Sequence, residues 1–169
     1  MVDKKKNRND LVKCLWHISI QRSILDFKCC KNEELNLFVE LTDKEITNIE
    51  IIDKQHANFV KIISELYELL GQNRPETIKY LLNQLVDETR IHFETEEKFM
   101  KEHNFSSYFS HKLEHDRFYS KVKNIRDKVF NGSEKVNLEM LKSFKLWLIN
   151  HIALNDKKLG EFLVENNYA

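Results

Sequence analysis

The amino-acid sequence predicts an all-α fold, an up-down-up-down antiparallel four-helix bundle with an N-terminal extension. The chain of 169 residues contains only three Gly and one Pro, a composition that favours long helices over turn-rich β structure. Apolar residues recur at intervals of three and four in four separate segments. The loops between these segments are short, so neighbouring helices should run antiparallel. We expect an extension of unknown role over residues 1–40 and the bundle over residues 41–169.

The apolar stripes, and the residues that interrupt them, define the expected helices. Gly71 ends the first helix, Pro75 fits the first turn of the second, and Gly132 ends the third. We expect an irregular lead-in over residues 41–50 and a turn over residues 104–107. The four stripes are Ile52, His56, Phe59, Ile63, Leu66 and Leu70; Ile78, Leu82, Leu85, Thr89, His92, Glu96 and Phe99; Tyr108, His111, His115, Phe118, Val122, Ile125 and Val129; and Leu141, Phe144, Trp147, Leu148, His151, Asn155, Leu159 and Phe162.

Two pairs of polar residues stand four positions apart within these stripes, His92 with Glu96 and His111 with His115. On a helix that spacing puts both members of a pair on one face, one turn apart. The turn between the pairs folds the two helices back on each other. Three imidazoles and a carboxylate then share one level of the interior, an arrangement that is typical of a metal site.

The first and fourth helices bring further polar side chains to that level. The starts of helices one and three of an antiparallel bundle lie beside the ends of helices two and four. For a single buried histidine, ordinary hydrogen bonding in the core is the better interpretation. That interpretation does not explain seven polar side chains gathered at one level of the core. Each unpaired polar group would cost about 1–3 kcal/mol, and two buried carboxylates would lack charge compensation. The seven candidate ligands, which should converge at one end of the core, are His56, His92, Glu96, His111, His115, His151 and Asp156.

Seven donors exceed what one ion usually takes from a protein, so two ions bridged by carboxylates fit better. Nitrogen and oxygen donors without thiolates suit iron or manganese and disfavour zinc. Asp156 follows His151 by five positions, which is about 140° round an ideal helix. Either the helix widens locally, or the short side chain of Asp156 reaches in from the flank as a bridging ligand.

The composition also bears on location and partners. The formal net charge is zero, so no nucleic-acid or anionic membrane surface is indicated, and no apolar run approaches the roughly 20 residues of a membrane span. Three cysteines, Cys14, Cys29 and Cys30, favour reduced thiols over a disulfide framework. We expect no signal peptide, because Lys13 and His17 break the N-terminal apolar run. These features predict a soluble cytoplasmic protein without nucleic-acid or membrane partners.

The motifs resemble those of the hemerythrin family, in particular the single-domain bacterial hemerythrins. The resemblance runs from about Leu41 to about Phe162 and includes the 15-residue gap between Glu96 and His111. The matching motifs are Asp53-Lys54-Gln55-His56; His92-Phe93 with Glu96-Glu97 and Met100; His111 and His115; and Trp147-Leu148 with His151-Ile152 and Asp156.

This resemblance implies a non-heme site that binds O₂ reversibly, with two iron ions in an oxo- or hydroxo-bridged di-iron centre. By that analogy one iron is held by His111, His115 and His151, the other by His56 and His92, and the bridging ligands are Glu96 and Asp156. The iron with two histidines keeps an open position for O₂. The matching O₂-pocket positions, for which ordinary core packing is the alternative interpretation, are Phe59, Phe93, Trp147, Leu148 and Ile152.

Three positions depart from the family pattern. Leu41 stands where the family usually has Trp, Asn48 where it has Gly, and Leu159 where Tyr is common. The approach to the first helix, and with it access to the site, is therefore expected to differ. About the first 38 residues match nothing in the family. They could pack on the bundle, mediate self-association or dock a protein partner.

Three classes of function compete. The leading hypothesis is reversible O₂ binding for carriage, storage or delivery by a protein that is not an enzyme. A di-iron oxidase, peroxidase or nitric-oxide-reducing enzyme is the first alternative, but Glu97 faces about 100° away from Glu96 and adds no acid–base group aimed at the site. An oxygen or iron sensor is the second alternative, which the N-terminal extension keeps open. A ferritin-like oxidase is disfavoured, because the sequence contains no Glu-x-x-His pair.

Overall fold

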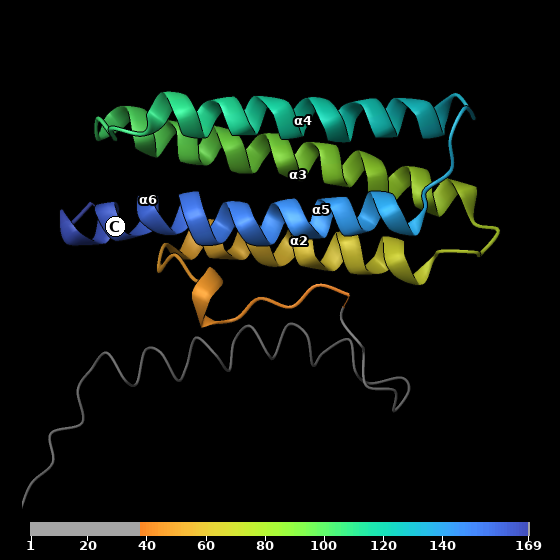
Figure 1. Ribbon diagram of the computed structural model, residues 1–169, viewed down its shortest axis with the longest axis horizontal. Helices are drawn as coiled ribbons and strands as arrows, with labels where there is room; N and C mark the ends of the chain where they lie inside the picture. Colours follow the sequence, from red (N-terminus) through yellow and green to blue (C-terminus); the bar gives the residue numbers. More distant parts are fainter. Residues whose placement is uncertain (1–37, 169) are drawn as a thin grey trace, which may run out of the picture. The chain divides into compact units, whose positions relative to one another are not determined.

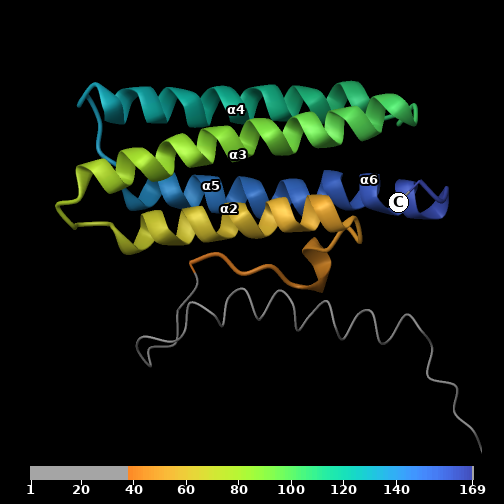
Figure 2. The same ribbon diagram turned by 180° about the vertical axis from the view of Figure 1, so that it is seen from behind.

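The computed structural model describes residues 38–168, and within them the chain forms four long helical rods. Figures 1 and 2 show these rods running back and forth, with α5, η3 and α6 joined end to end as the fourth rod. Helix α2 packs against α3 and α5, and α3 packs against α4. The predicted all-α antiparallel bundle is confirmed. The elements are η2 (Asp43–Glu45), α2 (Glu50–Glu68), α3 (Pro75–Glu102), α4 (Tyr108–Phe130), α5 (Leu138–His151), η3 (Ile152–Asp156) and α6 (Lys157–Glu165).

The turns between the rods lie where the sequence predicts them. Gly71 and Gly132 both adopt a φ of 77°, a left-handed conformation that glycine tolerates without steric conflict. Asn104, in the turn between α3 and α4, has a φ of 55°, and Asn is one of the few other residues that enter this region readily. Pro75 occupies the first turn of α3, where its missing N–H leaves no hydrogen bond unmade.

Two apolar clusters fill the bundle, one on each side of the level that holds the polar residues. The larger cluster includes Phe59, Leu85, Phe118 and Phe144. The smaller cluster closes the end of the bundle with Ile49, Ile52, Met100, Leu159 and Leu163. The sequence predicts polar residues at one end of the core, but the structure adds an apolar layer beyond them. This layer separates the polar residues from solvent at that end.

The lead-in to α2 is more ordered than the irregular segment that the sequence predicts. Thr42 and Glu45 form a reciprocal capping box around η2. Asp53 in the first turn of α2 accepts hydrogen bonds from the backbone N–H of Thr47 at 2.9 Å and of Asn48 at 3.1 Å. The φ of Asn48 is 65°, a left-handed conformation that Asn enters more readily than most residues and that Gly, the residue expected here from the motif pattern, adopts freely. At Gly160 an added Cβ would lie 2.3 Å from the carbonyl oxygen of Thr47, so α6 needs a glycine where the lead-in crosses it.

Residues 38 and 39, which the sequence prediction assigns to the extension, pack on the bundle. The ring of Phe38 stacks on Tyr67 with centroids 4.3 Å apart, and Lys145 Nζ donates to the carbonyl oxygen of Phe38 at 2.7 Å. Val39 is fully buried in the larger cluster. Bundle packing therefore begins at least three residues before residue 41, where the sequence prediction starts the bundle. The rest of the predicted extension, including its three cysteines, lies outside the described residues. Among the helices of residues 38–168, none combines the length and apolar character required to cross a membrane.

Candidate metal centre

A π-helical segment places Asp156 on the same face as His151. The segment η3 follows directly after α5, and the backbone N–H of Lys157 donates to the carbonyl oxygen of Ile152, five residues earlier. A π-turn takes more residues per turn than an α-helix, and it occurs often at functional sites. The five-residue spacing therefore corresponds to about one full turn here. Of the two explanations that the sequence leaves open for Asp156, local widening of the helix is the one observed.

Three histidines from α4 and α5 form one group around Asp156, and we call them the three-histidine group. The Nε2 atom of His151 lies 3.0 Å from Nε2 of His111 and 3.0 Å from Nε2 of His115. Oδ1 of Asp156 lies 3.0 Å from Nε2 of His111, and Oε2 of Glu96 lies 3.2 Å from Nε2 of His115. Two donors at right angles around one ion, with bonds of about 2.1 Å, would also lie about 3.0 Å apart.

The remaining histidines, His56 on α2 and His92 on α3, form the two-histidine group. Oδ2 of Asp156 lies 3.2 Å from Nε2 of His56 and 4.0 Å from Nε2 of His92. Oε2 of Glu96 lies 3.9 Å from Nε2 of His92. Ligand atoms of each group lie within 4.8 Å of one another, and Glu96 and Asp156 belong to both groups. The structure therefore brings all seven predicted residues together as two adjoining sets that share two carboxylates.

The burial of these side chains supports a cation at their centre. All seven residues are buried, and the relative accessibility of Glu96 and Asp156 is zero. Among the buried atoms without a hydrogen-bond partner are both oxygens of Glu96 and Nε2 of His56. Leaving such groups unpaired would cost about 1–3 kcal/mol each. The donor set of nitrogen and carboxylate oxygen fits a pair of iron ions, which would satisfy these atoms and neutralise the carboxylates.

Burial and neighbouring charges shift the pKa values of several side chains in the cluster. Burial lowers the pKa of His111, but contacts with Asp156 and Glu96 outweigh it and raise the pKa to about 9. Burial lowers the pKa of His92 to about 3. Burial and the charge of Asp156 raise the pKa of Glu96, yet neighbouring histidines lower it to about 2. Burial also opposes ionisation of Asp156, but the histidines hold its pKa well below the ordinary value. Both carboxylates are therefore anionic at neutral pH.

In four of the histidines, the Nδ1 atom points away from the centre of the cluster, and we call it the outer nitrogen. Each of these outer nitrogens faces a side chain to which the sequence prediction gives no role. Glu97, which the helix periodicity turns away from Glu96, reaches across to α4 and lies beside His115. Glu114 is the neighbour of His115 in sequence but lies beside His151. The distances to Nδ1 are 3.0 Å for Glu114 and His151, 3.5 Å for Glu97 and His115, 3.2 Å for Gln55 and His92, and 3.9 Å for Asp53 and His56.

Aromatic rings cover the side of the cluster that faces the larger apolar cluster. Phe93 stacks on His115 with centroids 3.8 Å apart, and Trp147 stacks on His151 at 4.2 Å. Phe118, which the sequence prediction treats as core alone, stacks on Trp147 at 3.7 Å and so supports it from behind. The other predicted pocket residues, Phe59, Leu148 and Ile152, are buried in the same apolar cluster. The polar cluster is therefore bounded by apolar side chains on both sides.

Over the described residues, the fold and the site together define a helical-bundle protein with two adjoining buried sets of candidate metal ligands. A family model described as the hemerythrin HHE cation binding domain matches residues 47–163. The chain is 28% identical over 117 residues to a bacteriohemerythrin from Methylococcus capsulatus, covering 69% of this chain and 89% of the relative. It is 32% identical over 110 residues to one from Pseudomonas aeruginosa, covering 65% of this chain and 71% of the relative.

The solved structures agree with this match. A crystal structure of wild-type hemerythrin superimposes with a TM-score of 0.70 at 27% sequence identity, covering 73% of this chain and 96% of that one. The chain belongs to the hemerythrin family, as the sequence motifs predict. The family binds a di-iron centre, and the buried donor set of this chain fits one.

Proposed function

We propose that this protein binds O₂ reversibly at a non-heme di-iron site and serves in carriage, storage or delivery. The observation that supports this most strongly is the pair of buried donor sets that share Glu96 and Asp156. Family membership and the bacteriohemerythrin relatives support the same function. When bound, the iron pair supplies the electrons for reversible O₂ binding.

The proposed ligands follow the two groups. His111, His115 and His151 hold one iron, and their close Nε2 spacing supports this. His56 and His92 would hold the other iron, with one histidine fewer. Glu96 and Asp156 would serve both irons, in keeping with their contacts to both groups.

The apolar side chains around the site exclude water and protons. Phe93 and Trp147 lie flat against ligand histidines, so they hold the imidazole rings in place and displace solvent beside them. Leu148 and Ile152 are buried next to the same cluster. A dry, apolar boundary of this kind limits proton access to bound O₂ and favours its release unchanged. We assign Phe59 to this boundary as well, since its ring meets His92 edge to face at 5.4 Å.

We also propose that the protein is a binder of O₂ and not an enzyme. Among the described residues, Glu97 and Glu114 face the Nδ1 atoms of His115 and His151, on the side of each ring that is turned away from the centre of the cluster. The alternatives are an oxidase, peroxidase or nitric-oxide-reducing enzyme, and an oxygen or iron sensor. The test below separates reversible O₂ binding, by a carrier or an oxygen sensor, from irreversible oxidation. The cytoplasmic location and the role of residues 1–40 stay predictions.

The test uses iron-loaded protein whose iron content has been measured and which has been reduced under anaerobic conditions. The visible absorption spectrum is recorded before and after the sample is exposed to air. A visible band that appears with O₂ and vanishes when O₂ is removed supports the proposal. Rapid conversion to an oxidised form without a stable adduct would favour an oxidase or peroxidase. The His111→Ala variant should lose iron and the band, and two retained irons per chain would refute the ligand assignment.

A further inference from the structure

The two histidine groups differ in the charge of the side chains behind them. In the three-histidine group, carboxylates of Glu114 and Glu97 face the outer nitrogens of His151 and His115. In the two-histidine group, the neutral amide of Gln55 faces the outer nitrogen of His92. The outer partners of a ligand histidine fix its tautomer and tune its basicity. The difference in charge behind the two groups should therefore affect how tightly each group binds its metal ion.

Thr95 determines which end of Gln55 faces His92. Its Oγ1 donates to the carbonyl oxygen of Ile91 at 2.8 Å and accepts from Nε2 of Gln55 at 3.1 Å. The amide oxygen of Gln55 is thereby turned to Nδ1 of His92. Because that oxygen only accepts hydrogen bonds, Nδ1 has the proton and Nε2 keeps its lone pair for the centre. This partner fixes the tautomer without adding a charge.

His56, the second member of that group, has no close carboxylate partner for Nδ1. The nearest is Oδ1 of Asp53 at 3.9 Å, beyond hydrogen-bonding distance. That oxygen already accepts from the N–H and the hydroxyl of Thr47, at 2.9 and 2.8 Å. The charge of Asp53 is therefore directed at the lead-in to α2 and only weakly at His56.

Glu114 acts on His151 at much closer range. Its Oε2 lies 3.0 Å from Nδ1 of His151 and accepts from Nδ2 of Asn155 at 3.0 Å. A carboxylate only accepts, so Nδ1 of His151 has the proton and Nε2 is free to bind a metal. Asn155 stands four residues after His151 and holds the carboxylate in this position. The contact is charge-assisted, and such hydrogen bonds are about twice as strong as neutral ones.

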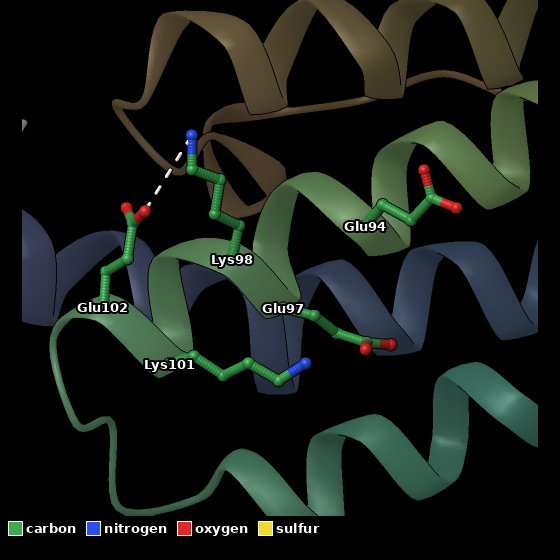
Figure 3. A pocket seen from close by; sticks show the side chains of 5 residues that line it. All are labelled: Glu94, Glu97, Lys98, Lys101 and Glu102. Carbon is green, nitrogen blue, oxygen red and sulfur yellow. Dashed lines mark ion pairs between the residues drawn. The ribbon is translucent and has the colours of Figure 1, made fainter.

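Glu97 lies beside His115 at 3.5 Å from its Nδ1 atom, but it does not make the hydrogen bond that Glu114 makes with His151. It lines a surface pocket of about 360 Å³ on α3, where Figure 3 shows it extending in a different direction from Lys98 and Glu102, which pair with each other. Its Oε1 also lies 3.4 Å from Nζ of Lys112, a cation that offsets part of its charge. Of the two carboxylates, Glu114 therefore has the larger influence on the three-histidine group.

We propose that Glu114, assisted by Glu97, is a positioning residue that makes the two halves of the metal centre unequal. By fixing the imidazole tautomer and placing negative charge behind it, Glu114 makes the three-histidine group the tighter iron site and the better one for ferric iron. The two-histidine group, with a neutral partner behind His92, is the weaker site. This inference rests on the proposed di-iron function.

The test measures the release of ferrous iron from the full-length, anaerobic protein to a strong chelator. Wild-type protein should lose its two irons in two phases. Glu114→Gln should accelerate the slow phase about 10–100-fold and leave the fast phase unchanged. Glu97→Gln should have a smaller effect of the same kind, and Glu114→Asp should restore part of the retention. The reduction potential of the Glu114→Gln centre should also shift to a more positive value, because ferric iron loses the support of the carboxylate.

Glu94→Gln is the matched control. Glu94 lines the same surface pocket as Glu97, but its exposed side chain pairs with Arg90 at 3.1 Å. It should release iron at the wild-type rates. Unchanged rates in Glu114→Gln, or equal acceleration of both phases, would overturn the inference. Wild-type protein that holds no iron or forms no reversible O₂ adduct would instead show that the proposed function fails. Because Glu114 is partly exposed and Gln is isosteric with it, circular dichroism should show the wild-type helix content.

Discussion

Oδ2 of Asp156 lies 3.2 Å from Nε2 of His56, although the two residues stand at opposite ends of the bundle sequence. The other oxygen of the same carboxylate, Oδ1, lies 3.0 Å from Nε2 of His111, which belongs to the three-histidine group. One short side chain therefore links both histidine groups. It reaches this position because η3 is π-helical. Its hydrogen bonds span five residues instead of the four of an α-helix, which brings Asp156 onto the same face as His151.

Removal of Asp156 should therefore affect both irons, whereas removal of a group-specific histidine should affect one. We expect Asp156→Ala to retain almost no iron, because the bridging carboxylate belongs to both donor sets. His56→Ala should retain up to one iron per chain, held by the three-histidine group. Metal analysis of the purified variants measures this. Two irons per chain in Asp156→Ala would contradict the bridging assignment.

Removal of the metal should destabilise the protein, because buried oxygens of Glu96 and a nitrogen of His56 then lack partners. Free metal at 100 times its dissociation constant stabilises a folded protein by about 2.7 kcal/mol. For a domain of this size that corresponds to a rise in Tm on the order of 10 °C. Calorimetry of iron-free and iron-loaded samples at equal concentration measures the difference. Identical melting temperatures would be inconsistent with a metal in the core.

The stability of the iron-free protein should fall between about pH 6.5 and 9. The pKa of His111 is raised from 6.5 to about 9 in the folded state. Its stabilising contribution is therefore complete below pH 6.5 and is lost as the pH rises through the folded pKa. The lowered pKa of His92 has the opposite sign and acts at acidic pH, where its contribution is lost as the pH falls towards about 3.

Urea unfolding at several pH values measures this slope. His111→Gln should flatten it, whereas His103→Gln, which changes a histidine outside the cluster, should keep it. Iron binding near pH 7 should in turn release protons, since a ligand nitrogen must lose its proton to bind the metal. A flat profile of the free energy of unfolding in the iron-free wild type would show that His111 has no raised pKa.

Leu148 should protect the iron centre from irreversible oxidation. Its side chain is 2% exposed and lies in the apolar cluster beside the site, whereas Leu146 on the same helix is 65% exposed. Leu148→Ala leaves a cavity that costs about 2–5 kcal/mol and admits water towards the site. We expect faster loss of the O₂-binding form at unchanged iron content. The control Leu146→Ala should behave as wild type, and equal oxidation rates in both variants would refute a pocket role for Leu148.

The helices and the convergence of the seven polar residues follow from the sequence because both depend on local periodicity. His92 and Glu96 must share a face at a spacing of four, and antiparallel packing brings their level to that of His111 and His115. The position of Asp156 does not follow, since a spacing of five fits a widened helix and a flanking approach equally well. Only the backbone of η3 distinguishes them.

The side chains behind the ligands were missed for a different reason. Periodicity describes where a Cβ points, but a glutamate side chain is long enough to reach a neighbouring helix. Glu97 leaves α3 away from Glu96 and still meets His115, and Glu114 of α4 meets His151 of α5. The packing of Phe38 and Val39 was missed because two apolar residues are too few to form a periodic pattern.

The proposed function requires that O₂ binds and leaves unchanged. The most direct measurement loads the reduced, iron-quantified protein with O₂, sparges it with inert gas, and determines how much O₂ is taken up and how much returns. For reversible binding we expect uptake of one O₂ molecule for each pair of irons and its recovery on sparging over repeated cycles. Consumption of O₂ without recovery, accompanied by conversion of the iron to its oxidised form, would contradict the account and identify an oxidising enzyme.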